Sequence, residues 1–375
     1  MGCAVSLPIV AAASVAWLLY SYNFEASTIC RLLRRHNFST VSANQAVFIT
    51  GCDSGLGYSL ALHAHKLGFT VLAGCLHPDG EGGKQLLQLC SKRLHVLGLD
   101  VTSGPSVHAA LKAVENILAR DKFLGVGEED YLFGVKAGHS LASNVLIVML
   151  LDSAMREPSV GELKALINNA GVMIFGEFEW LTEQHIQSQI NVNLLGTMRV
   201  TKSFCPLLRK YKGRIITISS HCAAASLPGL SVYGATKAGL AAWCDALRVE
   251  QAKYGVRVIS YVPGSFVQHS NIMVRQPEYA REMEEAMTPD DHQFFGDYFR
   301  RYNEYLCAIP TPGRPVPLPD DKIHSVLEEA LLSKYPYSSY TNETPRYKWY
   351  HFMFKISPAW LRDRLVKRFI KMPEF

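Results

Sequence analysis

The chain of 375 residues contains nine cysteines but no CxxC pair. The odd number and scattered positions of these cysteines argue against a disulfide framework and against a zinc site. Charged residues make up only 19% of the chain, and the net charge of +5 forms no basic block with interleaved aromatic residues outside the C-terminus. This absence excludes a nucleic-acid partner. With 48% hydrophobic residues the chain is neither disordered nor fibrous, and its expected partners are small molecules and membranes.

Residues 1–24 have no charged side chain and include an 18-residue apolar run that begins at Cys3. About 20 apolar residues span a bilayer as a helix, so this segment is expected to be a transmembrane anchor. A cleaved signal peptide is the alternative, but no Lys or Arg precedes the run and no clear small-x-small cleavage site follows it. The three arginines of the next segment, the basic linker of residues 25–44, have no counterpart before the run. The positive-inside rule therefore places the rest of the chain in the cytosol.

The C-terminal extension, residues 321–375, contains a second membrane candidate. Pro358, preceded by a serine, is typical of a helix start, and Leu361, Leu365 and Phe369 follow at intervals of four residues. Many of the other positions are basic, so we expect an amphipathic helix that can lie on anionic membrane lipid. Docking on the domain itself or on a partner subunit fits the same pattern equally well.

Residues 45–320 alternate short β-branched runs with helical patterns. Such alternation is typical of an α/β domain, so we expect a doubly wound parallel sheet, a Rossmann fold. Sheets of this kind bind ligands beyond the carboxyl ends of their strands, and the residues just after each strand are therefore the candidates for chemistry. The expected strands cover residues 45–50, 69–76, 95–101, 164–170, 213–220 and 256–263.

The first expected strand is followed by the glycine-rich sequence TGCDSGLG, residues 50–57. Glycines there allow the backbone to turn tightly and to approach a pyrophosphate, whose charge the N-terminus of the next helix stabilises. The position between a strand and a helix favours nucleotide binding over an ordinary turn, although the spacing is GxxxGxG rather than GxGxxG. The predicted cofactor contacts in this loop are Gly51, Asp53, Ser54, Gly55, Leu56 and Gly57.

Two more strand ends carry candidate cofactor contacts. Asp100, followed by Val101, can accept a hydrogen bond from an adenine amino group, or it can cap the next helix. The sequence Asn169-Ala170-Gly171 can pack around a ribose and brace the sheet, or it can be an ordinary turn at a strand end.

Tyr233 and Lys237 lie four residues apart in a helical pattern, so a helix places both on one face. An isolated pair of this kind is common on protein surfaces. Together with TGxxxGxG, the aspartate after the third strand, NNAG, a serine thirteen residues before the tyrosine and a following Pro-Gly, it resembles the short-chain dehydrogenase/reductase family. The resemblance covers about residues 45–264 and, with the N-terminal anchor, is to the membrane-bound branch of hydroxysteroid and retinol dehydrogenases. It implies an NAD(P)-dependent oxidoreductase of the endoplasmic reticulum membrane that interconverts a secondary alcohol and a ketone.

The resemblance implies catalytic roles for four residues of this chain. Tyr233 is the base or acid for the hydroxyl proton. A tyrosine pKa is usually about 10, which makes the side chain a poor base at neutral pH. The positive charges of the Lys237 ammonium and the oxidised nicotinamide are expected to lower this pKa. Ser220 is similar to the family's substrate serine, which stabilises the developing carbonyl oxygen. Asn193 matches the asparagine that holds a water linking Lys237 to solvent; the alternative is a helix-interior residue that binds backbone.

The cofactor is expected to be NAD rather than NADP. A 2′-phosphate requires Arg or Lys near the glycine loop or after the second strand, and this chain has Asp53 in the loop and neither basic residue after the strand. Asp53 would repel a phosphate and can accept a hydrogen bond from a 2′-hydroxyl. In the family, the loop of Pro263, Gly264 and Phe266 contacts the nicotinamide amide. Gln268 stands where relatives usually carry Thr, and its longer side chain is expected to bind the cofactor less tightly there.

Two segments stand apart from the core pattern. Residues 265–310, rich in Phe, Tyr and Met, are expected to form a mobile substrate loop over an apolar, flat substrate, a sterol or a retinoid; an ordinary packed subdomain is the alternative. Residues 121–160 are an anomalous insertion, interpreted as a retained intron or as a membrane-dipping flap. The family resemblance also implies a homodimer. The alternative to a working dehydrogenase is a catalytically silent scaffold that still binds the cofactor.

Overall fold

The computed structural model describes residues 38–42, 44–90, 92–124, 161–319, 321–370 and 372–375. The predicted anchor, residues 1–24, lies outside these ranges, as do most of the basic linker and residues 125–160 of the insertion. Within the described ranges, no helix combines the length and the hydropathy that crossing a membrane requires.

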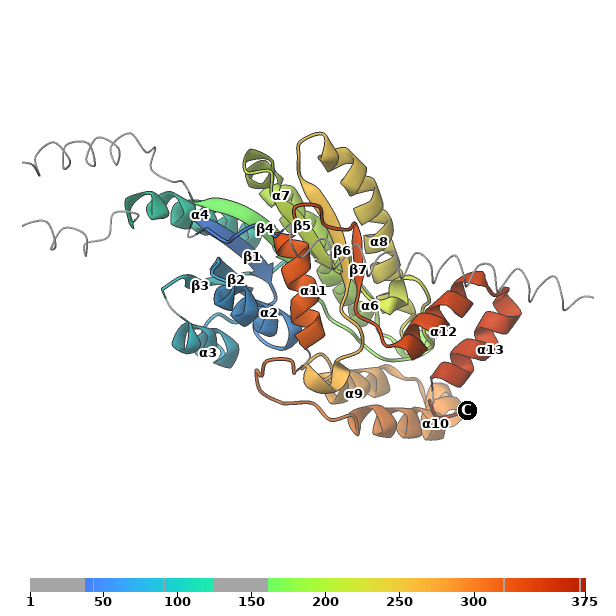
Figure 1. The fold of residues 1–375 in the computed structure, drawn as a ribbon. Coiled ribbons are helices and arrows are strands. Elements are labelled where there is room, and N and C mark those ends of the chain that lie inside the picture. Colours follow the sequence, from blue (N-terminus) through green and yellow to red (C-terminus); the bar gives the residue numbers. More distant parts are fainter. Residues whose placement is uncertain (1–37, 43, 91, 125–160, 320, 371) are drawn as a thin grey trace, which may run out of the picture.

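Seven parallel strands form one sheet in the order β3-β2-β1-β4-β5-β6-β7 (Figure 1). The strands are β1 (Gln45–Thr50), β2 (Thr70–Cys75), β3 (Leu94–Gly98), β4 (Glu162–Asn168), β5 (Arg214–Ile218), β6 (Arg257–Val262) and β7 (Ser339–Thr341). The first six overlap the strands that the sequence predicts, although β3 ends three residues before the predicted end at residue 101, and the predicted doubly wound parallel sheet is confirmed. The seventh was not predicted, because it is only three residues long and lacks an apolar run.

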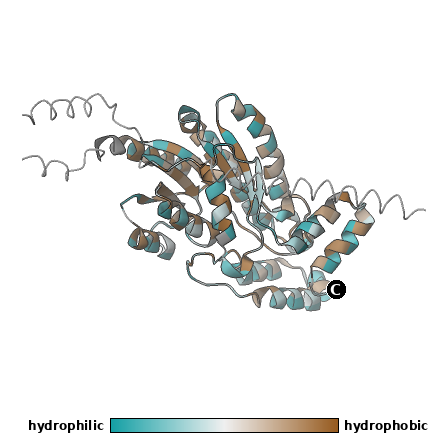
Figure 2. Ribbon diagram, in the orientation of Figure 1, coloured by the Kyte–Doolittle hydropathy of each residue, from teal (hydrophilic) through white to brown (hydrophobic). Residues whose placement is uncertain are grey.

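Helices cover both faces of the sheet, which explains why its strands are apolar on both sides. Val47 and Ile49 of β1 pack in one cluster, Ala46 and Phe48 in the other, and none of the four is exposed. Figure 2 shows hydrophobic residues along the strands between the helices. On one face lie α2 (Gly55–Lys66), α3 (Glu81–Leu89) and α11 (Asp321–Leu332), and on the other α4 (Gly104–Leu124), α7 (Thr197–Lys210) and α8 (Ser231–Ala252).

The sheet and its core extend beyond the domain boundary expected at residue 320. Leu327 and Leu331 of α11 are fully buried against the sheet, and Tyr340 of β7 is only 4% exposed. Strand β7 pairs with β6 from Ser260 to Val262. Residues 321–341 therefore belong to the Rossmann-type domain, and the C-terminal extension begins after β7.

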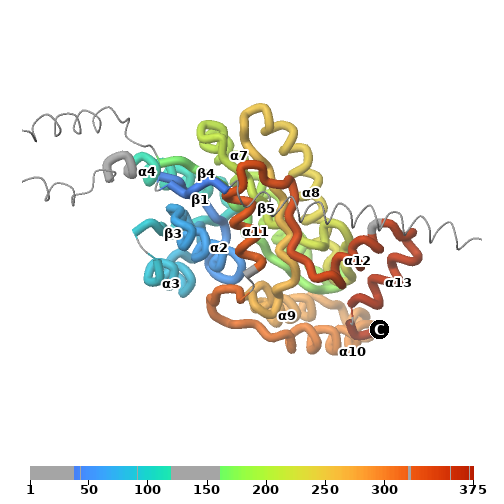
Figure 3. The backbone as a smooth tube through the Cα atoms, in the orientation of Figure 1, coloured from blue at the N-terminus to red at the C-terminus, as the bar shows by residue number. Residues whose placement is uncertain are grey.

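Residues 265–310 form two helices rather than an open loop. A 3₁₀ turn, η4 (Val267–His269), leads into α9 (Gln276–Ala286) and α10 (Pro289–Cys307). Both helices lie across the carboxyl ends of the strands, and the chain then returns through α11 to β7 (Figures 1 and 3). We call α9 and α10 the cover.

The chain ends in a helix pair, α12 (Pro345–Ile356) and α13 (Ala359–Phe369), so the helix expected after Pro358 is confirmed. Phe369 of α13 packs against the Tyr350 and Phe354 rings of α12 at centroid distances of 4.8 and 5.9 Å. The apolar face of α13 is thus partly used in docking on the protein itself. Trp360 at the start of α13 remains 63% exposed.

Candidate active site

The glycine loop between β1 and α2 is too tightly packed for side chains at two positions. Gly51 has φ of +70°, and a Cβ there would lie 2.8 Å from the Cα of Ala170. A Cβ on Gly57 would collide with the carbonyl of Gly51 and the side-chain amide of Asn169. The loop therefore brings bare backbone to the N-terminus of α2, with Ser54 as the residue before the helix. Backbone N–H groups at such a helix start bind a pyrophosphate, so the loop fits a dinucleotide.

Asn169 and Ala170 brace this loop from the end of β4. The Asn169 side chain donates to the carbonyls of Thr50 and Gly51 at 2.9 and 3.0 Å. The backbone N–H groups of Asn169 and Ala170 both donate to Oγ1 of Thr50, at 3.0 and 2.9 Å. Gly171 follows, and a Cβ there would lie 3.8 Å from Nζ of Lys237. The NNAG sequence thus connects the glycine loop to the YxxxK helix.

Asp53 reaches from the glycine loop to the end of β2. Its two carboxylate oxygens accept hydrogen bonds from the backbone N–H groups of Leu76 and His77, at 2.9 and 2.8 Å. These two residues directly follow β2. The carboxylate therefore occupies the region where dinucleotide-binding folds place the acidic residue that binds a ribose 2′-hydroxyl.

Asp100 lies at the end of the third strand region, just before α4. Its Oδ1 accepts hydrogen bonds from the backbone N–H and the hydroxyl of Thr102, at 2.8 and 2.7 Å. The Asp100 side chain therefore stabilises a local turn just before α4, a role that resembles the predicted alternative of a helix cap. The carbonyl of the next residue, Val101, accepts from Arg199 at 2.6 Å, which ties this turn to α7.

Ser220, Tyr233 and Lys237 come together where β5 ends beside α8. Tyr233 is 8% exposed, and burial raises its pKa above the usual range, while a hydrogen bond with the Ser220 side chain works in the opposite direction. The nearby Cys222 also raises this pKa. Nζ of Lys237 lies 5.7 Å from the centre of the Tyr233 ring. Burial is therefore the largest influence on the Tyr233 pKa and outweighs the lowering that the sequence predicts from Lys237.

Lys237 is 4% exposed and donates through Nζ to the carbonyl of Ile218 at 3.0 Å. Burial lowers the pKa of its ammonium to about 8, against an ordinary value of 10.5. Below pH 8 the folded protein therefore buries a charge, and this charge costs stability. Between pH 8 and 10.5 the folded state has lost a proton that the unfolded state still holds, so stability rises with pH in that window.

A Lys237→Met variant is expected to be more stable than the wild type at pH 7, because it removes the buried charge. The difference in unfolding free energy should shrink by about 3 kcal/mol as the pH rises from 8 to 10.5. Denaturant unfolding of both proteins across this range measures it. Lys202→Met, at an exposed position of α7, is the control and should show no such trend. A difference for Lys237→Met that does not depend on pH would contradict the buried-ammonium interpretation.

Asn193 lies in a π-helical segment, η2 (Ile190–Gly196), which joins α6 (Glu183–Gln189) to α7. Its side chain binds the backbone of Val172 in both directions: Oδ1 accepts from the N–H at 2.8 Å and Nδ2 donates to the carbonyl at 2.9 Å. Nδ2 also donates to the hydroxyl of Thr236 at 3.2 Å. The side chain thus fixes the segment after NNAG to α8, as in the backbone-binding alternative. π-Helical segments are frequent at functional sites.

The loop after β6 lies next to the strand end of β7. Gly264 has φ of +89°, and a Cβ there would collide with the carbonyl of Asn342. The carbonyl of Pro263 accepts a hydrogen bond from the Asn342 side chain at 3.4 Å. Phe266 packs against the α2 and α11 side of the core, and Gln268 is exposed in η4.

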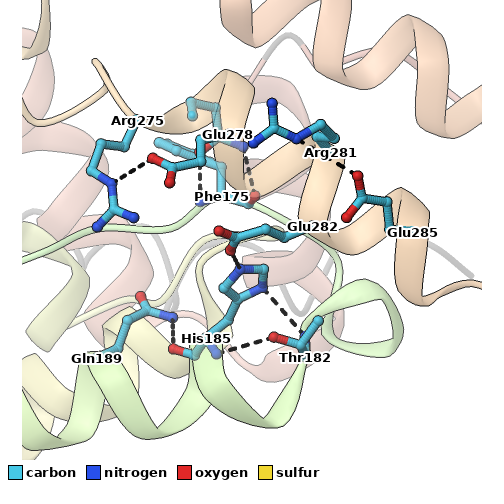
Figure 4. Close-up of polar contacts among 10 residues, drawn as sticks. Phe175, Thr182, His185, Gln189, Arg275, Glu278, Arg281, Glu282 and Glu285 are labelled. Carbon is cyan, nitrogen blue, oxygen red and sulfur yellow. Dashed lines mark hydrogen bonds and ion pairs between the residues drawn. The ribbon is translucent and has the colours of Figure 1, made fainter.

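The cover is fastened to the core by polar contacts of α9 (Figure 4). Gln276 pairs with the backbone of Phe175: its Oε1 accepts from the N–H at 3.2 Å and its Nε2 donates to the carbonyl at 2.8 Å. Nε2 of His185 lies 2.6 Å from the carboxylate of Glu282, and Nδ1 accepts from the N–H of Thr182 at 3.4 Å. Both imidazole nitrogens are thus engaged, one with the cover and one with the core.

A second set of contacts fastens α10. Trp180, in the 3₁₀ turn η1 (Phe178–Trp180), is 3% exposed and forms T-shaped contacts with four aromatic rings at centroid distances from 5.1 to 6.0 Å. These rings belong to Phe295, Tyr298, Phe299 and Tyr302. Sequence reasoning did not identify Trp180, His185 or Gln276, because their partners lie about a hundred residues away and no local pattern marks them.

The comparison with known proteins agrees with this geometry. D-beta-hydroxybutyrate dehydrogenase, mitochondrial, of Mus musculus is 34% identical over 303 residues, which cover 80% of this chain and 77% of that protein. The chain belongs to the short-chain dehydrogenase family. The model of the short chain dehydrogenase family matches residues 147–278. As a short-chain dehydrogenase, the protein is an NAD(P)-dependent oxidoreductase that acts on CH–OH groups.

Other dehydrogenases are similarly related. Estradiol 17-beta-dehydrogenase 2 of Rattus norvegicus is 31% identical over 328 residues, 87% of this chain and 74% of that protein. Retinol dehydrogenase 5 of Homo sapiens is 32% identical over 311 residues, 82% of this chain and 84% of that protein. A solved short-chain dehydrogenase from Streptomyces avermitilis shares the fold, with a TM-score of 0.53 and 21% identity over 86% of this chain and 95% of that one.

Proposed function

We propose that this short-chain dehydrogenase interconverts a secondary alcohol and a ketone on a sterol-like lipid, with Tyr233 exchanging the hydroxyl proton. The observation that carries the substrate class is the surroundings of Tyr233. This residue belongs to one contiguous apolar cluster that includes Met283 of α9 and Phe299 and Tyr302 of α10. A cover of Met and aromatic side chains in the same apolar cluster as Tyr233 favours a flat, apolar substrate over a small charged one.

The remaining active-site residues have supporting roles in this proposal. Ser220, hydrogen-bonded to Tyr233, donates to the substrate oxygen as it becomes a carbonyl. Lys237, with its ammonium 5.7 Å from the Tyr233 ring, favours the phenolate of Tyr233 when the proton leaves. Asn193 holds the backbone at Val172 and so positions the residues beside Lys237. When bound, the nicotinamide accepts or supplies the hydride.

We infer that the cofactor is NAD rather than NADP. Asp53 lies between the glycine loop and the end of β2, and its carboxylate is held there by two backbone N–H groups. From this place it accepts from a ribose 2′-hydroxyl and repels a 2′-phosphate. The pyrophosphate is held by the backbone around Gly55 and Leu56, and Asp100 and Val101 flank the adenine.

Asp53→Asn is expected to lower the preference for NAD over NADP, measured as the ratio of the two kcat/KM values, by about tenfold. The variant keeps the size of the side chain and removes the charge. Asp79→Asn is the matched control. Asp79 is an exposed carboxylate in the loop after β2, the loop whose backbone N–H groups bind Asp53. A ratio that changes with Asp79→Asn and stays constant with Asp53→Asn would move the specificity determinant out of the glycine loop.

The finer proposal is a role in steroid hormone metabolism, specifically ecdysteroid synthesis, since the TGCDSGLG loop, the second strand and the anchor resemble the insect enzyme Shroud. Retinol is the alternative substrate, in line with the name of one relative. Membranes with wild-type or Tyr233→Phe protein are incubated with sterols, ecdysteroid precursors, retinol and 3-hydroxybutyrate, each with NAD or NADP. Mass spectrometry is expected to show loss of two hydrogens from one sterol, with NAD and only in the wild type.

Other outcomes of that experiment separate the alternatives. Oxidation of retinol alone would keep the chemistry and overturn the sterol proposal. Oxidation of 3-hydroxybutyrate alone would show that the cover does not select apolar substrates. Retained NAD binding without turnover of any compound would favour the catalytically silent scaffold.

We also propose that the protein resides in the endoplasmic reticulum membrane, with its catalytic domain in the cytosol and in a homodimer. The apolar run that begins at Cys3 supports the anchor, and the basic α13, with Trp360 63% exposed, supports contact with anionic lipid. Deletion of residues 1–24 is expected to make the protein extractable from membranes by alkaline carbonate. Protease protection tests the orientation, and light scattering of the detergent-solubilised enzyme tests the dimer. Carbonate extraction of the intact chain would overturn the anchor.

A further inference from the structure

Two histidines and a glutamate from distant parts of the chain meet beside the turn that carries Ser220. Nδ1 of His221, in the 3₁₀ turn η3 (His221–Ala223), lies 2.8 Å from Oε1 of Glu343, and Nδ1 of His351 lies 3.0 Å from the same oxygen. The ligand atoms of all three residues lie within 4.8 Å of one another. The two imidazole rings are stacked, with centroids 4.2 Å apart.

We propose that His221, Glu343 and His351 form a binding site for a divalent transition metal ion, with Zn²⁺ as the best match. Two imidazole nitrogens and one carboxylate oxygen are a frequent zinc ligand set that leaves a fourth position for water. Neighbouring ligand atoms around tetrahedral zinc lie roughly 3.3 Å apart, given bonds of about 2.0 Å. The observed separations of 2.8 and 3.0 Å would have to open by a few tenths of an ångström. The third pair of ligand atoms lies within 4.8 Å and would have to close by up to about 1.5 Å. Nitrogen ligands disfavour Mg²⁺ and Ca²⁺, which prefer oxygen.

The burial of the three side chains adds an electrostatic reason. Glu343 is 9% exposed and each histidine 15%, so a carboxylate and two imidazoles share a largely dry space. Burying the Glu343 carboxylate between the two imidazoles carries an electrostatic cost, which a bound cation would offset. Nε2 of His221 is buried and has no hydrogen-bond partner among the described residues. Hydrogen bonding within the described protein therefore does not fully satisfy this histidine.

The place of the cluster in the fold indicates what the ion does. His221 directly follows Ser220, whose Oγ accepts from the N–H of Cys222 at 3.2 Å. Glu343 follows β7, and His351 lies in the middle of α12. A metal ion here would join the turn of the substrate serine to the C-terminal helix pair. It would be a structural ion beside the active site, and it has no part in the hydride or proton transfer proposed above.

The cysteine positions argue against a cysteine-based zinc site, and the site proposed here uses no cysteine. Its three ligands are separated by up to 130 residues of sequence, so no local pattern marks it. The chain also provides an internal comparison. His63 stacks on His324 at 4.7 Å, with the Glu328 carboxylate 3.9 Å from Nε2 of His63, but the ligand atoms of these three do not converge as a metal-binding group.

The test uses the full-length protein in detergent, purified through a tag without histidine. Zn²⁺ is titrated in competition with a chromogenic chelator, and Co²⁺ is added separately as a spectroscopic probe. The wild type is expected to bind one Zn²⁺ per chain at this site, to gain thermal stability with rising Zn²⁺ concentration, and to give the intense visible absorption of tetrahedral Co²⁺. Mg²⁺ should produce none of these effects.

Variants separate a metal site from a cluster of hydrogen bonds. Glu343→Gln keeps an oxygen that accepts from both histidines but removes the charge, and His351→Ala removes one ligand; each should weaken Zn²⁺ binding more than about tenfold. His63→Ala should retain the wild-type affinity. NAD binding by each variant verifies that it is folded. Absence of Zn²⁺ binding by the wild type, or equal affinity in Glu343→Gln, His351→Ala and the wild type, would overturn the proposal.

Discussion

Tyr233→Phe is expected to lower kcat by about a thousandfold, with the fold and NAD binding retained. The substitution removes one oxygen atom, and with it the group that exchanges a proton with the substrate hydroxyl. The ring stays in its apolar cluster, which includes Val232 and Leu230. Removal of the buried hydroxyl also removes its hydrogen bond with the Ser220 side chain, so a small loss of stability, about 1 kcal/mol, is expected.

The measurements for this variant are single-turnover kinetics and cofactor titration. Tyr58→Phe is the matched control, since it also removes a tyrosine hydroxyl. That hydroxyl donates to Oε1 of Gln85 at 3.0 Å, not to Ser220. The control should keep its kcat and lose only a small amount of stability. Activity of Tyr233→Phe within tenfold of the wild type would assign proton transfer to another group.

Gly57→Ala should abolish detectable cofactor binding, with Kd for NAD raised by at least about a hundredfold. The new methyl group would overlap the backbone carbonyl of Gly51 and the side-chain amide of Asn169. A backbone carbonyl, unlike a side chain, cannot rotate away from the methyl group. The Asn169 amide would leave the carbonyls of Thr50 and Gly51, so the loop would lose its brace. Both the stability of the domain and the pyrophosphate site depend on this contact.

Isothermal titration with NAD and thermal unfolding measure the two effects of Gly57→Ala. Gly104→Ala, at the start of α4, is the control, because a Cβ there has no heavy atom within 4 Å. The control should bind NAD normally and unfold at the wild-type temperature or slightly above it. Wild-type NAD affinity in Gly57→Ala would show that the loop can rearrange, and that close backbone approach is not what binds the cofactor.

The fold could be predicted from the sequence largely because its core elements are locally encoded. Six strands are at least five residues long and rich in apolar and β-branched residues, and the glycine loop follows the first of them directly. Strand β7 could not be found in this way, since Tyr340 is its only buried residue and its position depends on pairing with β6. The position of α11 could not be found in this way either, because its sequence shows amphipathic character but not which face of the sheet it covers.

In the candidate site, too, some contacts follow from local sequence and others depend on the tertiary fold. Tyr233 and Lys237 are one helical turn apart, so their proximity follows from helix geometry alone. The contact of Gln276 with Phe175 and that of Glu282 with His185 join segments that only the tertiary fold brings together. The π-helical path at Asn193 is likewise a tertiary result, because the side chain is bound to Val172 on another segment.

The position of β7 has a consequence for how the protein is made. Synthesis proceeds from the N-terminus, so β6 emerges from the ribosome well before its neighbour β7, with the whole cover in between. Until residues 339–341 and α11 emerge, β6 is an open edge strand, and the face that Leu327 and Leu331 later cover is exposed to water. Exposed apolar edges of this kind are where nascent chains aggregate or recruit chaperones. A premature stop after the cover would therefore release a chain whose catalytic residues are all present but whose sheet lacks its edge strand β7 and the helix α11.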